Sequence, residues 1–351
     1  MRNLLSRIAA RRCCYTNETF ENARARLRPD QAPLPAAQGR EQSNFEAAIF
    51  DELLKTHHQL TEYTFGIRRV CPLPDSLELE VESEERAKEI LSRFLPACDE
   101  TGEEVSGLLG LRVTKYTKRG IELHVAGQET SLWLTGLPIG TWRNAERGVL
   151  DSTQAAGWQP LWRKAHTWSR QELAFEARWN TGEWNRQMHT GAWCTSGLLR
   201  RIPLFHRMSP AQVVTGFKGL PVVGYDGFGP VRWVFEIDFP DTRHHADSLV
   251  DLLTDHIFGL PLAPALHLEE SQGKPLPPNI RRLDDAERTA LLEMRLSTNM
   301  YRSYINGHPE TAGRIQHRVA AVLAKHEANS RSAPRVDALP AVSEPAAPGP
   351  R

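Results

Sequence analysis

The sequence lacks long hydrophobic runs and cysteine pairs with C-x-x-C spacing. In its 351 residues no apolar run approaches the ~18 residues that a membrane-spanning helix needs, so we expect no such helix. The five cysteines include no C-x-x-C pair and their number is odd, which argues against a disulfide framework and a structural zinc site. We therefore expect a reducing, cytoplasmic environment.

Short catalytic signatures are also missing. The chain has no P-loop, nucleophile elbow, H-E-x-x-H helix, kinase motif set or C-x-x-C-H motif. The glycine-rich stretch 224–229 has the look of a phosphate loop, but it lies between two expected strands and is typical of a hairpin turn. These absences lower the expectation of an enzyme without excluding a site built from distant residues.

Charge is balanced overall but unevenly distributed. The formal net charge is zero, with 43 basic and 43 acidic residues, and most of the basic ones are arginine. Residues 1–40 and 111–218 carry a basic excess, whereas 41–110 and 219–351 carry an acidic excess. Such blocks either dock on each other within one fold or present opposite patches to partners, and we favour the internal pairing.

Residues 1–12 have an amphipathic, arginine-rich pattern. Leucine, isoleucine and alanine form one side, arginines surround it, and the first acidic residue is Glu18. This pattern favours an ordinary first helix, because folded helix is expected directly after it. The alternative is a mitochondrial transit peptide, which has the same character.

Residues 1–60 are expected to form a helical N-terminal lobe. Asn17 is a candidate cap for a helix that Pro29 ends, and Ser43 with Glu46 resembles a capping box that opens the next helix. From residue 77 the hydrophobic period changes to two, which predicts the first strand of a different unit.

Residues 61–140 predict an α+β unit in the order β-α-β-β-β. Strands are expected at 77–81, 109–117, 121–125 and around 132–134, with a helix after Ser83. These elements would form an antiparallel sheet with a helix on one face. Its open face is expected to carry mainly polar side chains, namely Glu78, Glu80, Arg112, Thr114, Glu122, His124 and Trp133.

The rest of the chain divides into three parts. Residues 141–208 predict a Trp-rich helical bridge, with a Ser169–Glu172 capping box. Residues 209–328 predict a second β-hairpin with helices, and 329–351 predict a disordered tail. Expected features of 209–328 are a Ser209–Gln212 capping box, strands at 221–225 and 231–239, a helix from Asp241 to Gly259, a long helix from Asp284 through Tyr304, and a last helix at 309–327.

Eight of the nine tryptophans lie between Trp133 and Trp193, in a basic part of the chain. Aromatic planes interleaved with arginine can hold single-stranded nucleic acid, by base stacking and phosphate contacts. The other interpretation, which we favour, is that the indoles fill a core and arginine stems cover them. If the segment does bind a ligand, the candidate residues are Arg163, Lys164, Trp168, Arg170, Arg200 and Arg201.

A second candidate site follows the strand at 231–239. Glu236 and Asp238 share one face of that strand, and the adjacent His244 and His245 come shortly after. Two carboxylates and two imidazoles could hold a divalent metal or act as acid and base. Charged strand faces and histidines at helix starts are more often solvated, so this site is the lesser expectation.

From the sequence we expect a non-catalytic cytoplasmic binding protein that needs no cofactor. Its best single partner class is nucleic acid, with an acidic protein surface as the alternative partner. A metal-assisted hydrolase or nuclease using Glu236 and Asp238, with a divalent metal, is the competing function. A scaffold or assembly protein that associates through its last two helices is a third.

Overall fold

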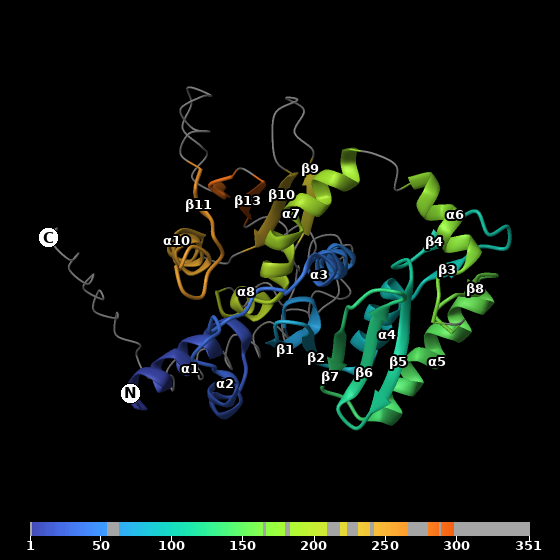
Figure 1. The fold of residues 1–351 in the computed structure, drawn as a ribbon, viewed down its shortest axis with the longest axis horizontal. Helices are drawn as coiled ribbons and strands as arrows, with labels where there is room; N and C mark the ends of the chain where they lie inside the picture. The colour runs from blue at the N-terminus through green and yellow to red at the C-terminus, as the bar shows by residue number, and fades with distance from the viewer. Residues whose placement is uncertain are drawn as a thin grey trace, which may run out of the picture.

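The computed structural model describes residues 2–54, 63–163, 166–179, 183–208, 218–222, 231–238, 242–265, 280–287 and 289–297. Helices and strands are mixed in an α+β fold, as the sequence predicts (Figure 1). In these ranges the strands form two five-stranded sheets and one small three-stranded sheet. Figure 1 shows α1 and α2 at one end of the molecule and α5 and α6 at the other.

The N-terminal lobe contains α1 (Arg2–Thr16), α2 (Phe20–Arg26) and α3 (Arg40–Leu54). Its helices do not stand apart from the rest, because α1 packs against α8 and α3 packs against α7. Tyr15 of α1 is fully buried, stacks on Phe258 with ring centroids 5.5 Å apart, and donates a hydrogen bond to the carbonyl of Leu252. The lobe is therefore part of a common core with the later helices.

Two predicted helix starts in this lobe are wrong. The cap of α2 is Thr19, whose hydroxyl accepts from the Asn22 amide at 3.3 Å, whereas Asn17 has a positive φ of 55° and donates to a carbonyl of the first strand. Helix α3 already begins at Arg40, so Ser43 lies inside it. Glu46 is fully buried and pairs with α7 instead of closing a capping box, because a distant arginine supplies stronger donors.

The first sheet has the strand order β1-β2-β7-β6-β5. Its strands are β1 (Ile67–Pro72), β2 (Leu77–Val81), β5 (Leu111–Thr117), β6 (Gly120–Val125) and β7 (Leu132–Thr135). The predicted strands are confirmed, and β1 was not predicted because a register shift near Arg69 breaks its alternation. The sheet is mixed and not purely antiparallel, since β2 and β7 run parallel.

One face of this sheet is the centre of the core. Leu77, Leu79 and Val81 of β2 are fully buried, as their alternation with glutamates predicts. They pack with α4 (Glu84–Phe94) and α5 (Ile139–Ala155), two helices that also pack against each other. Ser83 caps α4 by accepting from the Arg86 amide, which confirms that prediction.

The segment after α4 adds a small sheet at the far end. Its strands β4 (Val105–Ser106), β3 (Ala97–Cys98) and β8 (Gln159–Pro160) lie in that order. The predicted bridge at 141–208 is mainly helical, as expected. It contains most of α5, then β8, α6 (Arg170–Trp179), α7 (Glu183–Leu199) and α8 (Ile202–Met208).

The second five-stranded sheet has the order β11-β12-β13-β10-β9. Its strands are β9 (Lys218–Val222), β10 (Val231–Asp238), β11 (Ala263–Pro264), β12 (Ile280–Asp284) and β13 (Ala290–Ser297). The predicted hairpin is confirmed as the antiparallel β9–β10 pair. The long helix predicted from Asp284 is wrong, because that segment forms β12 and β13, and β13 pairs parallel with β10.

The pattern of β13 explains this error. Leu292 and Leu296 fit a helical spacing of four, but Leu292, Met294 and Leu296 also fit a strand alternation. Ala290, Leu292 and Met294 are buried, and pairing with β10 decides in favour of the strand. The scaffold hypothesis places its oligomer face on the last two helices; the first of these is a strand up to Ser297, and the second lies outside the described residues.

Helix α10 (Thr242–Leu253) ends earlier than predicted. Asp255 closes the turn after it, since its carboxylate accepts from the amides of Ile257 and Phe258 at 2.9 Å. Several predictions lie outside the described residues. These are the Asp241 cap, the Ser209–Gln212 capping box, the helix at 309–327 and the tail at 329–351.

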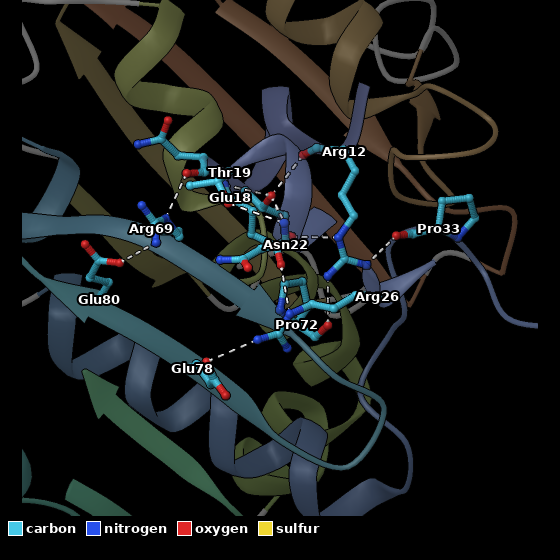
Figure 2. A network of polar contacts seen from close by, with 12 residues as sticks. Arg12, Glu18, Thr19, Asn22, Arg26, Pro33, Arg69, Pro72, Glu78 and Glu80 are labelled. Atoms are coloured by element: carbon cyan, nitrogen blue, oxygen red, sulfur yellow. Dashed lines mark hydrogen bonds and ion pairs between the residues drawn. The ribbon is translucent and has the colours of Figure 1, made fainter. Parts of the chain in front are cut away.

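The basic and acidic blocks pair with each other inside the fold. Arg12, only 2% exposed, donates to Glu18 at 2.6 Å, and Arg26 bridges Glu18 and Glu78 of β2 at 3.4 and 3.6 Å (Figure 2). Figure 2 also shows Arg69 directed toward Glu80. Arg26 thus links residues 1–40 to the acidic block 41–110, and Arg119–Glu78 and Arg200–Glu46 link 111–218 to it. The Arg12–Glu18 and Arg69–Glu80 pairs lie within one block.

Candidate binding surface

The residues of the Trp/Arg-rich segment that directly follow β8 are buried. Leu161 and Trp162, directly after β8, are 0% and 2% exposed. The chain then passes the open face of the first sheet near residues 166–169 and enters α6 at Arg170. Residues 164 and 165 lie outside the described part.

The carboxylate of Glu146, on α5, accepts three hydrogen bonds, two of them from this segment. It accepts from the hydroxyl of Tyr116 and, at 3.0 Å each, from Trp162 Nε1 and Arg163 Nε. Burial raises the pKa of Glu146, but the hydrogen bonds from Tyr116, Arg163 and Trp162 outweigh it and leave the pKa below its usual value. Burial and the bond to Glu146 raise the pKa of Tyr116, so a neutral phenol faces an ionised carboxylate.

Glu172 fixes the start of α6 to the edge of the sheet. Its two oxygens accept from Arg112 Nη1 at 3.0 Å and Nη2 at 2.8 Å, with both side chains buried. Glu172 Oε2 also accepts from the Ser169 amide, and Ser169 Oγ accepts from the Glu172 amide, which confirms the predicted capping box. Burial raises the pKa of Glu172, and the stronger opposing effect of Arg112 and the amide donors lowers it overall.

Trp168 also packs against the first sheet, at Ala126 and Gly110. Its indole donates to the carbonyl of Ala126 at 2.9 Å and lies against Gly110, where a Cβ would come within 2.7 Å of the ring. Gly110 also has a φ of +74°, so both space and backbone conformation require glycine there. Trp168 therefore has a structural anchor and only part of its ring surface remains accessible.

Two imidazoles meet where the segment crosses the open face. His124 of β6 and His166 have ring centroids 6.5 Å apart in a stacked arrangement. His166 is exposed and His124 is half-buried. Burial lowers the pKa of His124 most. Glu122 opposes this as the next-largest effect, and His166, Arg112 and Lys115 lower the pKa further, so that it stays below its usual value.

Two of the predicted binding residues are inside the protein. Arg200 is 0% exposed and pairs with Glu46, and Arg201 is 4% exposed and donates to three backbone carbonyls between 2.6 and 2.8 Å. Burial lowers the pKa of Arg201 to about 9. Both arginines hold the core together, and their guanidinium groups are not presented to a ligand.

The remaining predicted residues lie at the surface. Arg163 has 49% of its side chain exposed and Arg170 is exposed, whereas Trp168 is half-buried. Lys164 lies outside the described residues. Arg163, Trp168 and Arg170 thus come from one continuous segment that borders β5 and β6.

The described indoles belong mostly to the core. Trp142, Trp162 and Trp233 are 2% exposed or less, and four others are half-buried. The half-buried ones are Trp133, Trp158, Trp168 and Trp193. Of these, Trp158, Trp168 and Trp193 pack against the core cluster. The side chains of Trp179 and Trp184 lie outside the described part.

The alternative site on β10 is placed only by its backbone. Glu236 lies opposite Lys218 of β9 and Arg295 of β13, and His244 and His245 lie in the first turn of α10. The side chains of the four candidates are outside the described part. Among the residues that are described, no group of three or more acidic, histidine or cysteine side chains could hold a metal ion. A rise in melting temperature with Mn²⁺ would test the metal hypothesis directly.

Sequence patterns missed three side chains of the cluster at Glu146. Tyr116 and Glu146 are separated by 30 residues, and Arg143 reaches the Tyr116 ring from one turn of α5 earlier, with its Cζ 5.8 Å from the ring centre. The only local signal was that Arg143, Glu146 and Val149 follow a helical spacing. No pattern could show which strand that helix faces.

The arrangement is suited to holding anions. The buried carboxylates of Glu146 and Glu172 have internal partners, and Arg163, His166 and Arg170 are exposed. In the described helices, none is long and apolar enough to cross a membrane. Comparison with protein families, curated proteins and solved structures finds no match.

Proposed function

We propose that this chain is a non-catalytic binding protein that contacts nucleic acid through the surface around Arg163, His166 and Arg170. The observation that carries the proposal is the separation of charges in this segment. Its acids are directed inward, with Glu172 on Arg112, while Arg163, His166 and Arg170 are left at the surface. Exposed cations whose nearest buried carboxylates already have internal partners favour a phosphate-bearing ligand.

The mode of contact differs from the one expected for single strands. Base stacking needs exposed aromatic faces, and the described indoles are buried or half-buried. We infer that binding rests on phosphate contacts, which are independent of base sequence. Probes of equal length and different base sequence should then bind with comparable affinity.

A triple variant tests this function. Replacing Arg163, Lys164 and Arg170 with glutamine should weaken binding to all probe sequences alike and reduce the slope of log affinity against log salt. An Arg7→Gln variant on α1, at the opposite end of the molecule, is the control and should bind normally. If the triple variant binds as tightly as the parent protein at two salt concentrations, the proposal is wrong.

We further propose a cytoplasmic location. All five cysteines are free thiols, and Cys71, Cys98 and Cys194 are buried. Burial raises the pKa of Cys194 to about 12, so this thiol stays protonated and unreactive. Free thiols of this kind are typical of a reducing compartment.

A further inference from the structure

Arg163 is a surface arginine whose orientation is fixed from within. Its Nε donates to Glu146 Oε1 at 3.0 Å, yet 49% of its side chain is exposed. Among the described residues this is its one ion pair, and that pair uses the nitrogen nearest the chain. The two terminal nitrogens, which match the oxygens of a phosphate, are therefore left for a ligand.

Glu146, the carboxylate that binds Arg163, is held in place by further contacts. Glu146 is 6% exposed, and Trp162 Nε1 and the Tyr116 hydroxyl hold its other lone pairs. Trp162 itself is 2% exposed, so the carboxylate cannot turn without disturbing the core. An exposed pair adds little stability of its own, which makes orientation its main effect.

A second cation, Arg143, lies next to the Glu146–Tyr116 pair. The guanidinium carbon of Arg143 is 5.8 Å from the centre of the Tyr116 ring, and Arg143 is exposed. Arg143 and Arg163 both act on the charge state of Tyr116, which shows that they share one neighbourhood. Two cations against one buried carboxylate leave this point of the surface with a net positive charge.

We propose that Arg163 and Arg143, held by the Glu146–Tyr116 pair, form a phosphate clamp. The ligand class is a phosphate group, carried either by a nucleic-acid backbone or by a free polyphosphate. The clamp rests on the proposed function when its ligand is nucleic acid, but it stands independently when the ligand is free. Glu146 and Tyr116 are positioning residues, because they act through the arginines.

The test separates the effect of positive charge from the effect of side-chain geometry at position 163. Arg163→Lys keeps the positive charge but loses both the planar fork and the Nε anchor, whereas Arg163→Ala removes everything. If the clamp is correct, both variants weaken binding of inorganic tripolyphosphate by about tenfold, measured by titration calorimetry. Arg7→Lys and Arg7→Ala on α1 are the matched controls and should leave the affinity unchanged.

A second measurement monitors the proposed site directly. The indole N–H of Trp162 shares its carboxylate with Arg163, so its NMR resonance should shift when tripolyphosphate binds. A Tyr116→Phe variant keeps the ring below Arg143 and removes only the hydroxyl, and should reduce the affinity less than Arg163→Ala does. Unfolding curves confirm that each variant is folded, which the exposure of Arg163 leads us to expect.

The possible outcomes separate the clamp from the proposed function. Tripolyphosphate binding that depends on Arg163, without oligonucleotide binding, supports the clamp and overturns the nucleic-acid function. Oligonucleotide binding with an Arg163→Lys variant equal to the parent supports that function and overturns the clamp, because charge alone then suffices. Failure of both probes to bind overturns both.

Discussion

Arg200 donates to both carboxylate oxygens of Glu46, from Nε at 2.7 Å and from Nη2 at 2.5 Å, and both side chains are fully buried. Ser196 adds a third donor at 2.6 Å, and Arg200 Nη1 also donates to two backbone carbonyls. Arg200 directly follows α7 and Ser196 lies within it, so these contacts join α3 to the end of α7 across 154 positions of sequence. It also explains why a predicted ligand-binding arginine is a core residue.

Breaking this pair should destabilise the protein severely. Arg200→Met leaves the Glu46 carboxylate buried without its main partner, which should cost about 3–5 kcal/mol in the free energy of unfolding. Urea denaturation measures the change. Arg281→Met, which breaks an exposed pair with Asp247, is the control and should lie within about 1 kcal/mol of the parent. Equal midpoints for the two variants would contradict the assigned role of Arg200.

Acid should weaken the fold through His124. Burial lowers the pKa of this imidazole from its ordinary value of 6.5, so the folded state favours the neutral form. The unfolded chain then takes up the proton first, and the stability present above pH 6.5 is lost as the pH falls through and below it. Urea midpoints at pH 7.5 and 5.5 should differ less in His124→Asn than in the parent. An unchanged difference between the two midpoints would show that another group dominates this pH range.

Removing residues 1–12 should prevent stable folding. The deletion takes Arg12 away from Glu18, whose side chain is 1% exposed, and leaves that carboxylate without its shortest ion pair. Circular dichroism during heating should show a lost or strongly lowered transition, whereas deletion of residues 2–5 should have little effect because Leu4 and Leu5 are exposed. A normally folded protein after the longer deletion would instead favour the transit-peptide interpretation.

Tryptophan fluorescence should be largely shielded from iodide in the native protein. Seven of the nine indoles have described surroundings, and each is buried or half-buried. The Stern–Volmer slope should therefore be well below the slope in denaturant. If the two slopes are similar, exposed indoles carry the emission, and base stacking becomes a better account of nucleic-acid binding than phosphate contacts alone.

Local chemistry explains which parts of the fold could be predicted. The alternation of Leu77, Leu79 and Val81, the Ser83 cap and the Ser169–Glu172 box are all decided within a few residues. Each confers a preference that the tertiary structure retains. Where two periods fit equally, as at Leu292 and Leu296, the local signal was ambiguous, and pairing with β10 chose the strand.

The candidate site could be predicted only in part. The sequence marked Arg163, Trp168 and Arg170 because they are neighbours in a basic, aromatic segment. It could not distinguish them from Arg200 and Arg201, since exposure depends on which helix faces α3 and the turn after α10. Tyr116 and Arg143 gave no signal, because their meeting with Arg163 requires β5, α5 and β8 to be in place.

The sequence by itself determined the α+β class and the positions of many helices and strands. Those properties depend on hydrophobic period and on turn and cap residues, all of which act over short distances. Only the tertiary structure decided the parallel β2–β7 and β10–β13 pairs, the burial of Arg200 and the exposure of Arg163. These depend on contacts between distant segments, whose free energy is gained only once the chain has folded.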